Sequence, residues 1–155
     1  MMKVFFRLAT QDDRDFISQL SASVFSMFGN YDDILTNWFL QPGVLTIIVM
    51  EETDPLGFAM LGLAREGDFE SYAGELLAMA VIPEYQRRGI GNALLTNIES
   101  LALQYGLSEL HLHTARDNKA ACSFFKKAGF KIIGFRQSYY PKGQPALMMT
   151  KMFGS

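Results

Sequence analysis

The stretch "VIPEYQRRGIGNALL", from Val81 to Leu95, limits the fold of this chain more than any other segment. An apolar run closes on a proline, and an arginine pair and two glycines then lead into a helical pattern. Gly89 and Gly91 lack Cβ atoms, so an anion can approach the backbone where the helix begins. Unpaired helix N–H groups, the positive end of the helix dipole, and Arg87 and Arg88 all favour a phosphate there. The segment therefore predicts a pyrophosphate cradle between a strand and a helix.

Other interpretations of this segment have to be weighed. A short G-x-G pattern also occurs in solvated turns, where the glycines only ease the entry into a helix. A Rossmann loop would have a third glycine at the position of Leu94, and the P-loop pattern G-x-x-x-x-G-K-[ST] is absent. The two common nucleotide-binding loops are thus disfavoured.

Hydrophobic periodicity places further elements along the chain. Alternating or β-branched runs predict strands at 3–9, 44–50, 57–64, 72–82, 109–114, 131–137 and 146–153. Helical spacing predicts helices at 10–28, 31–40, 88–105 and 117–130. This order indicates an α/β (α+β) fold, a mixed sheet with helices on both faces. At 155 residues we expect a single domain spanning 1–155.

Composition narrows the class of protein. The chain is 49% hydrophobic, and 14 basic against 16 acidic side chains give a net charge of -2, which argues against a general nucleic-acid binder. The single cysteine cannot form an internal disulfide, and the N-terminus lacks a signal-peptide core. The apolar runs are too short for a membrane helix. We expect a cytoplasmic protein with neither nucleic acid nor membrane as partner, either a monomer or a homodimer joined through a sheet edge.

Two motifs carry a family resemblance. The string from Gln86 to Gly91 resembles the acetyl-CoA pyrophosphate motif Q/R-x-x-G-x-G/A of the GNAT superfamily of N-acetyltransferases. The string "RDNKAACSFFKKAGF" is similar to the second motif of that superfamily, an asparagine, a short helix and a "GF" that opens the next strand. The resemblance extends over nearly the whole chain, and "SYYPKGQPALMM" is similar to the C-terminal hairpin of the ribosomal-protein alanine acetyltransferase branch.

This resemblance implies a fold, a co-substrate and its contacts. The fold would be a GNAT-type twisted sheet of about seven mostly antiparallel strands. The co-substrate would be acetyl-CoA, with no metal. The implied cofactor-binding residues are Met79, Ala80 and Val81 along the pantetheine arm, Gln86, Arg87, Arg88, Gly89, Ile90, Gly91 and Asn92 at the pyrophosphate, and Asn118 and Phe125. Asn118 is also a plausible helix N-cap, and the two roles can coexist.

The resemblance also suggests where catalysis occurs. Acetyl transfer needs a neutral amine, so a general base or a water chain must remove a proton. Glu75 matches the base glutamate of histone-acetyltransferase-like members and is the first choice. His113 stands where the alanine acetyltransferase branch has a glutamate, and an imidazole with an unperturbed pKa of about 6.5 suits the same task. Both residue types also occur as ordinary solvent-facing or half-buried strand residues.

Phe125 departs from the family pattern. Many members have a tyrosine there that protonates the leaving thiolate, and phenylalanine has no proton to donate. Either the thiolate leaves unaided, or Tyr139 or Tyr140 reaches in from the hairpin, or the protein binds acetyl-CoA without efficient catalysis. We therefore expect an acetyl-CoA-dependent N-acetyltransferase acting on a primary amine of a protein N-terminus or small molecule. The alternatives are a non-catalytic acyl-CoA-binding or sensor domain, and a cradle for a different phosphorylated ligand.

Three further features complete the sequence predictions. His111 and His113 form an H-x-H pair, but the rest of the chain offers too few Cys and His residues for a zinc site. Cys122 lies within an apolar helix without an activating neighbour and is expected to pack rather than react. The acceptor pocket is expected to be formed by residues before Val44 and by the loop at 139–144, with these side chains named: Tyr31, Asp32, Asp33 and Trp38.

Overall fold

The structure, a computed structural model, describes residues 3–29, 31–63 and 73–153, and at residues 28, 31 and 32 it describes the backbone alone. The strands are β1 (Phe5–Leu8), β2 (Val44–Glu51), β3 (Asp54–Gly62), β4 (Ala73–Val81), β5 (Glu109–Ala115), β6 (Lys131–Arg136) and β7 (Ala146–Met152). The helices are η1 (Gln11–Asp13), α1 (Arg14–Phe25), η2 (Ser26–Phe28), α2 (Tyr31–Trp38), η3 (Pro83–Tyr85), α3 (Ile90–Gln104) and α4 (Lys119–Lys127). None of the helices in these ranges has the length and apolar character that crossing a membrane requires.

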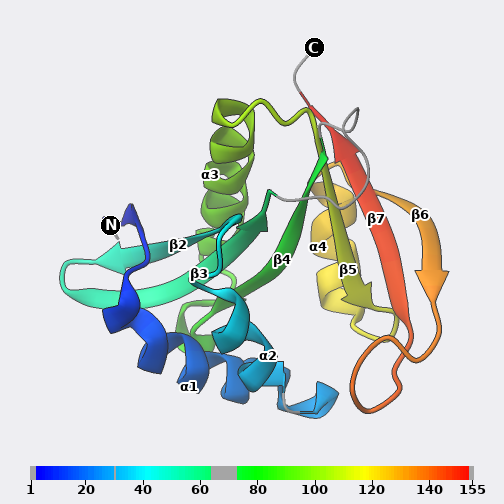
Figure 1. Cartoon of the computed structure of the whole chain (residues 1–155), viewed down its shortest axis with the longest axis horizontal. Helices are drawn as coiled ribbons and strands as arrows, with labels where there is room; N and C mark the ends of the chain where they lie inside the picture. The colour runs from blue at the N-terminus through cyan, green and yellow to red at the C-terminus, as the bar shows by residue number, and fades with distance from the viewer. Residues whose placement is uncertain (1–2, 30, 64–72, 154–155) are drawn as a thin grey trace.

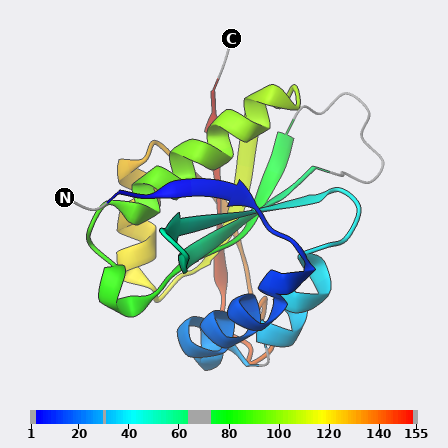
Figure 2. The same ribbon diagram turned by 90° about the vertical axis from the view of Figure 1, so that its left-hand side faces the viewer.

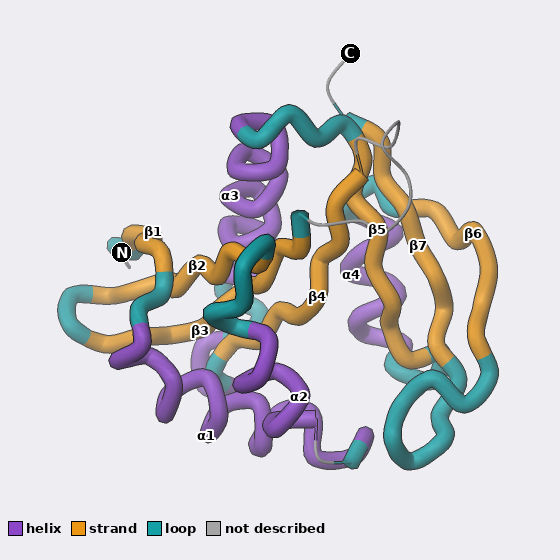
Figure 3. The backbone as a smooth tube through the Cα atoms, in the orientation of Figure 1, coloured by secondary structure: helices purple, strands orange, loops and turns teal. Residues whose placement is uncertain are grey.

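The described strands form one seven-stranded sheet in the order β1-β2-β3-β4-β5-β7-β6 (Figures 1 and 3). Neighbouring strands are antiparallel except for β4 and β5, which are parallel. A parallel pair cannot be joined by a tight turn, and α3 provides the crossover. The predicted mixed, mostly antiparallel sheet with helices on both faces is confirmed.

Each face of the sheet buries its own apolar cluster. Helix α3 presents Leu94 and Ile98 to one face, where α4 also packs, and both side chains are fully buried. Helices α1 and α2 cover the other face through Ile17 and Leu35, which join Phe58 of β3. Figure 2 shows the sheet between α3 on one side and α1 and α2 on the other. Burial of these side chains is the main force that holds the helices to the sheet.

The 3-10 turn η1, which leads directly into α1, begins with a capping box. The Thr10 hydroxyl accepts a hydrogen bond from the backbone N–H of Asp12, and the Asp13 carboxylate accepts one from the backbone N–H of Thr10. The guanidinium of Arg7 in β1 donates to both Asp13 oxygens at 2.8 Å. The predicted N-cap at Thr10 is confirmed, and the Arg7 contact ties that cap to the edge of the sheet.

The pairing of β4 with β5 ends halfway along the strands. The last paired residues are Leu76 and Leu112, and beyond them the two strands diverge (Figure 1). Leu77 is an extra residue in β4 where the register with β3 shifts, between Leu76 and Ala78. A bulge bends the strand that contains it and increases its twist. The bulge at Leu77 therefore accompanies the divergence that leaves the outer half of β4 without a strand partner on its β5 side.

Candidate active site

A cavity of about 590 Å³ occupies the space between β4 and α4. One wall is the outer half of β4, and the floor is the loop and first turn that lead into α3. Helix α4 forms the opposite wall, and Ser23 and Val24 of α1 reach the rim. Most residues of the predicted cofactor-binding set line this cavity, namely Met79, Ala80, Val81, Gln86, Arg87, Gly89, Gly91, Asn92, Asn118 and Phe125. The divergence of β4 from β5 thus gathers most of that set around one space.

The loop before α3 has the backbone geometry of an anion cradle. Arg87 and Gly89 both have positive φ angles, 65° and 82°, and α3 begins only at Ile90. The helix predicted from Arg88 was therefore placed two residues too early, because a left-handed residue cannot continue an α-helix. A Cβ added to Gly91 would lie 3.4 Å from the ring of Phe124, which is an ordinary van der Waals contact. These features fit the diphosphate of acetyl-CoA at the helix N-terminus.

Three predicted cradle residues have structural partners of their own. The Gln86 amide donates a hydrogen bond to the Val81 carbonyl at 3.0 Å, which ties the loop back to the end of β4. The Arg88 guanidinium lies over the ring of Tyr85, 5.1 Å from its centroid, in a cation–π contact, and Arg88 is not among the residues lining the cavity. The Ile90 side chain is buried in the core, so only its backbone can face a ligand. Of the two arginines, therefore, Arg87 lines the cavity and Arg88 does not.

Helix α4 presents one face to the cavity. Asn118 is its N-cap, and the side-chain oxygen accepts a hydrogen bond from the backbone N–H of Ala121 at 3.1 Å. Asn118, Ala121 and Phe125 follow i, i+3, i+7 spacing, so all three line the same wall. Phe125 is buried and meets Phe130 edge to face, with ring centroids 5.6 Å apart. The predicted N-cap role of Asn118 is confirmed, and the same side chain is available to a ligand.

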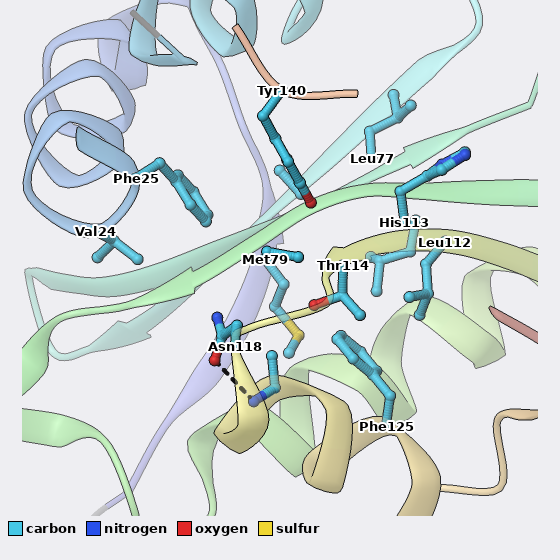
Figure 4. A pocket seen from close by; sticks show the side chains of 14 residues that line it. Val24, Phe25, Leu77, Met79, Leu112, His113, Thr114, Asn118, Phe125 and Tyr140 are labelled. Carbon is cyan, nitrogen blue, oxygen red and sulfur yellow. Dashed lines mark hydrogen bonds between the residues drawn. The ribbon is translucent and has the colours of Figure 1, made fainter. Parts of the chain in front are cut away.

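A second cavity of about 160 Å³, called here the chamber, continues from the first into the divergence of the strands. The two share five lining residues, namely Val24, Met79, Asn118, Ala121 and Phe125. Figure 4 shows the chamber with Val24 and Phe25 of α1 on one side and Leu112 and Phe125 on the other. The Tyr140 hydroxyl points into it, and the imidazole of His113 turns outward, away from the Tyr140 hydroxyl.

Glu75 and His113 meet beside the chamber. Glu75 Oε1 lies 3.4 Å from Nδ1 of His113, and the His113 ring stacks on Tyr139 with centroids 4.4 Å apart. Within the described residues neither ring nitrogen of His113 has a hydrogen-bond partner. A small recess here, lined by Glu75, His113, Tyr139 and Trp38, shares Leu76, Leu77 and His113 with the chamber. His113 thus belongs to both spaces, whereas Glu75 belongs to the recess alone.

The loop between β6 and β7 contributes Tyr140 to the chamber and Tyr139 to the recess. The Gln144 amide donates a hydrogen bond to the Met27 carbonyl at 2.6 Å, joining the loop to the end of α1. Burial raises the pKa of the Tyr140 hydroxyl, and Tyr139 and Cys122 add to the rise. Burial also raises the pKa of Tyr139, with a smaller contribution from Glu75. Both phenols therefore stay protonated at neutral pH and can donate hydrogen bonds.

Several lining residues carry no sequence signal of their own. Ser23, Val24 and Phe25 reach the site only because α1 packs across β4, a tertiary contact that periodicity does not reveal. Ala121 was within reach of prediction, because it lies one turn after Asn118 on the same helix face, and Phe124 lies one turn after Ala121. Of the side chains expected at the acceptor pocket, Trp38 lines the recess, whereas those of Tyr31 and Asp32 lie outside the described part of the structure.

Cys122 and the metal prediction can also be compared with the structure. Cys122 is buried, its thiol contacts the Ala115 carbonyl, and burial raises its pKa, which disfavours the reactive thiolate. No cluster of three or more His, Cys, Asp or Glu side chains in the described ranges is placed to hold a metal ion. His111 instead approaches Glu109, with Nε2 and Oε1 2.9 Å apart.

Comparison with known proteins finds acetyltransferase relatives. The sequence profile of the acetyltransferase (GNAT) family matches residues 12–130. An N-alpha-acetyltransferase of Sulfurisphaera tokodaii is 34% identical over 78 residues, which cover 50% of this chain and 47% of that protein. The [ribosomal protein bS18]-alanine N-acetyltransferase of Escherichia coli K12 is 36% identical over 66 residues, 43% of this chain and 45% of that enzyme. The match thus spans less than half the length of each of these relatives.

Solved structures share the fold over nearly the whole chain. The PaiA N-acetyltransferase of Thermoplasma acidophilum in complex with coenzyme A superposes with a TM-score of 0.78, covering 98% of this chain and 100% of that one. The sequence identity is 20%, so this likeness concerns the fold alone. The overall arrangement of the sheet and its helices is therefore a recurring architecture.

Proposed function

The chain belongs to the acetyltransferase (GNAT) family, and from this we propose that it transfers an acetyl group from acetyl-CoA to a primary amine. The observation that carries the proposal is the continuous passage from the glycine cradle, between β4 and α4, to the chamber beside Glu75 and His113. The amino-acetylating relatives named above favour a protein N-terminus as the acceptor.

The residues for the donor are those of the larger cavity. Its volume, the left-handed Gly89 and the place of Gly89 and Gly91 in its lining suit an extended ligand with a diphosphate at one end. We assign the diphosphate to the backbone N–H groups at the start of α3 and to Arg87. Beyond Leu76, β4 has no partner among the described strands on its β5 side, so its backbone can pair with an amide-bearing arm. Acetyl-CoA supplies the activated acyl carbon as a thioester.

We assign to the Glu75–His113 pair the removal of a proton from the incoming ammonium group. The recess holds a carboxylate beside the rings of Trp38 and Tyr139, a combination that attracts a cation from solvent. His113 lines both recess and chamber, and its ring nitrogens lack other hydrogen-bond partners among the described residues, so it can accept a proton directly or through one water. Glu75 then stabilises the imidazolium. In this proposal His113 is the base, and Glu75, which was the first choice from the sequence, supports it.

We assign to Tyr140 the role of donating a hydrogen bond to the leaving thiolate. Phe125 lines the chamber but has no hydroxyl, whereas the Tyr140 hydroxyl points into the chamber from the hairpin (Figure 4). A thiol pKa of about 8.5 makes thiolate departure undemanding, so a hydrogen bond from a neutral phenol is sufficient help. The Tyr139 ring is engaged with His113 and is assigned a positioning role.

The experiment is a mass-spectrometric screen of the full chain with acetyl-CoA against peptides of varied N-terminal residue, polyamines, amino acids and aminoglycosides. Acetylated product from one acceptor class supports the proposal and identifies the class. Protein that binds acetyl-CoA by calorimetry but gives no product with any class supports the non-catalytic acyl-CoA-binding alternative. Tight binding of free nucleotides in preference to acetyl-CoA would favour a different phosphorylated ligand.

A further inference from the structure

The chamber has more apolar space than an acetyl group needs. At about 160 Å³ it matches the roughly 150 Å³ apolar cavity that is known to hold benzene, with six carbon atoms. An acetyl group places two carbons there. Its lining is mostly aliphatic or aromatic: Val24, Phe25, Leu76, Leu77, Ala78, Met79, Leu112, Ala115, Ala121 and Phe125.

Four polar side chains also line the chamber, namely His113, Thr114, Asn118 and Tyr140, and the Tyr140 hydroxyl points into it (Figure 4). Asn118 belongs to the boundary with the larger cavity, and its side-chain oxygen is engaged by the Ala121 backbone. The imidazole of His113 turns outward from the chamber (Figure 4). Apart from the Tyr140 and Thr114 hydroxyls, the lining between α1 and the diverging strands is mostly hydrocarbon, which suits the apolar part of an acyl chain.

The connection of the chamber to its neighbours indicates which ligand the apolar space serves. It shares five lining residues with the larger cavity, whereas it shares only Leu76, Leu77 and His113 with the acceptor recess. A thioester entering along β4 carries its acyl chain beyond the sulfur, in the direction of the chamber. From this geometry we infer that the chain accepts acyl-CoA donors longer than acetyl, with propionyl and butyryl groups filling the chamber.

This inference rests on the proposed function and extends it to the class of donor. The balance of the reaction is the same for each donor. The amine nitrogen forms the new C–N bond, the C–S bond breaks with its electron pair going to sulfur, and the proton lost by nitrogen compensates the thiolate. Each methylene that becomes buried tightens donor binding by up to about fourfold. An acyl chain of about eight carbons is too long for a chamber whose volume matches a cavity that holds a six-carbon ring, so we expect octanoyl-CoA to bind more weakly.

The test is calorimetric titration of the wild-type chain with CoA and with acetyl-, propionyl-, butyryl- and octanoyl-CoA. The inference predicts affinity rising or holding from acetyl to butyryl and falling at octanoyl. A tenfold or greater loss from acetyl to propionyl would overturn it while leaving the proposed function intact, as would identical affinities for all chain lengths. Failure of CoA itself to bind would overturn both. The readout is binding, so it does not depend on knowing the acceptor.

A matched pair of variants locates the acyl chain. Ala78 lines the chamber and Ala73, on the same strand and also buried, does not. Ala78→Val adds two methyl groups to the chamber and is expected to lower the ratio of butyryl-CoA to acetyl-CoA affinity by tenfold or more, whereas Ala73→Val leaves the ratio unchanged. An unchanged ratio in Ala78→Val, with the KM of peptides bearing large N-terminal residues raised instead, would assign the chamber to the acceptor and contradict the inference.

Discussion

The Glu75 carboxylate approaches the imidazole of His113 across the parallel strands β4 and β5, with Oε1 3.4 Å from Nδ1. The two side chains lie side by side because Glu75 pairs in register with His111, one alternation before His113 on the same face of β5. Tyr139 from the β6–β7 loop stacks on the outer face of the His113 ring. Three elements distant in sequence therefore hold one imidazole beside the chamber.

This arrangement predicts that Glu75→Gln lowers kcat by about a hundredfold or more, since the amide cannot stabilise the imidazolium. The affinity for acetyl-CoA should be unchanged, because Glu75 does not line the donor cavity. Glu109→Gln is the matched control, because Glu109 contacts His111 within β5 and lines neither the chamber nor the recess. Steady-state kinetics and calorimetry check the pair, and equal losses in both variants would contradict the role of Glu75.

Two glycine variants distinguish the effect of the cradle on acetyl-CoA binding from the effect of backbone strain on stability. Gly89 and Gly106 flank α3 with φ angles of 82° and 79°, and a Cβ at either position meets nothing within 4 Å. Alanine at each should cost about 1 kcal/mol of stability through the left-handed backbone. Gly89→Ala alone should weaken acetyl-CoA binding, because Gly89 lines the cavity. Thermal unfolding and calorimetry measure both effects, and equally weakened binding in Gly106→Ala would remove the cradle assignment.

The acid role assigned to Tyr140 predicts that Tyr140→Phe lowers kcat about 10- to 100-fold with little change in the affinity for acetyl-CoA. Phe125 lines the chamber from the opposite helix, so Phe125→Tyr offers a second position for a hydroxyl. The double variant should recover part of the lost kcat. Wild-type kcat in Tyr140→Phe would show that the thiolate leaves unaided.

The Arg7–Asp13 pair predicts a pH-dependent stability. Hydrogen bonds from Arg7 hold the pKa of Asp13 below its ordinary value, opposed by burial. The contribution is therefore complete above the unfolded pKa of about 3.9 and is lost as the pH falls through the lower folded value. Asp13→Asn should cost about 1–2 kcal/mol at pH 7, and the difference from wild type should shrink towards pH 2. Denaturant unfolding measures this, with the exposed Asp12→Asn as control, and a pH-independent difference would contradict it.

Much of the fold could be predicted because its signals are local. The glycines before α3, the Asn118 cap of α4 and the alternation of β5 each follow from short stretches of sequence. Strand boundaries were less secure. Strand β3 begins at Asp54, three residues before its prediction at 57, because Pro55 sits within the paired strand after a two-residue turn.

The parts of the site that escaped prediction depend on tertiary geometry. The bulge at Leu77 leaves the apolar pattern of β4 intact, so nothing in the sequence marks the point where β4 leaves β5. Arg88 was assigned to the anion, and its cation–π contact with Tyr85 depends on the left-handed turn at Arg87. Val24 joins the chamber only because α1 crosses the sheet there.

The central claim is acetyl transfer beside His113, and the most direct test measures product and binding together. Wild type and His113→Gln are incubated with acetyl-CoA and an N-terminal peptide panel, product is followed by mass spectrometry, and acetyl-CoA binding is measured by calorimetry. The account predicts acetylated peptide from wild type, and at least about a hundredfold less from His113→Gln with acetyl-CoA binding retained. Wild-type rates from His113→Gln, or bound acetyl-CoA without any acetylated peptide from wild type, would contradict it.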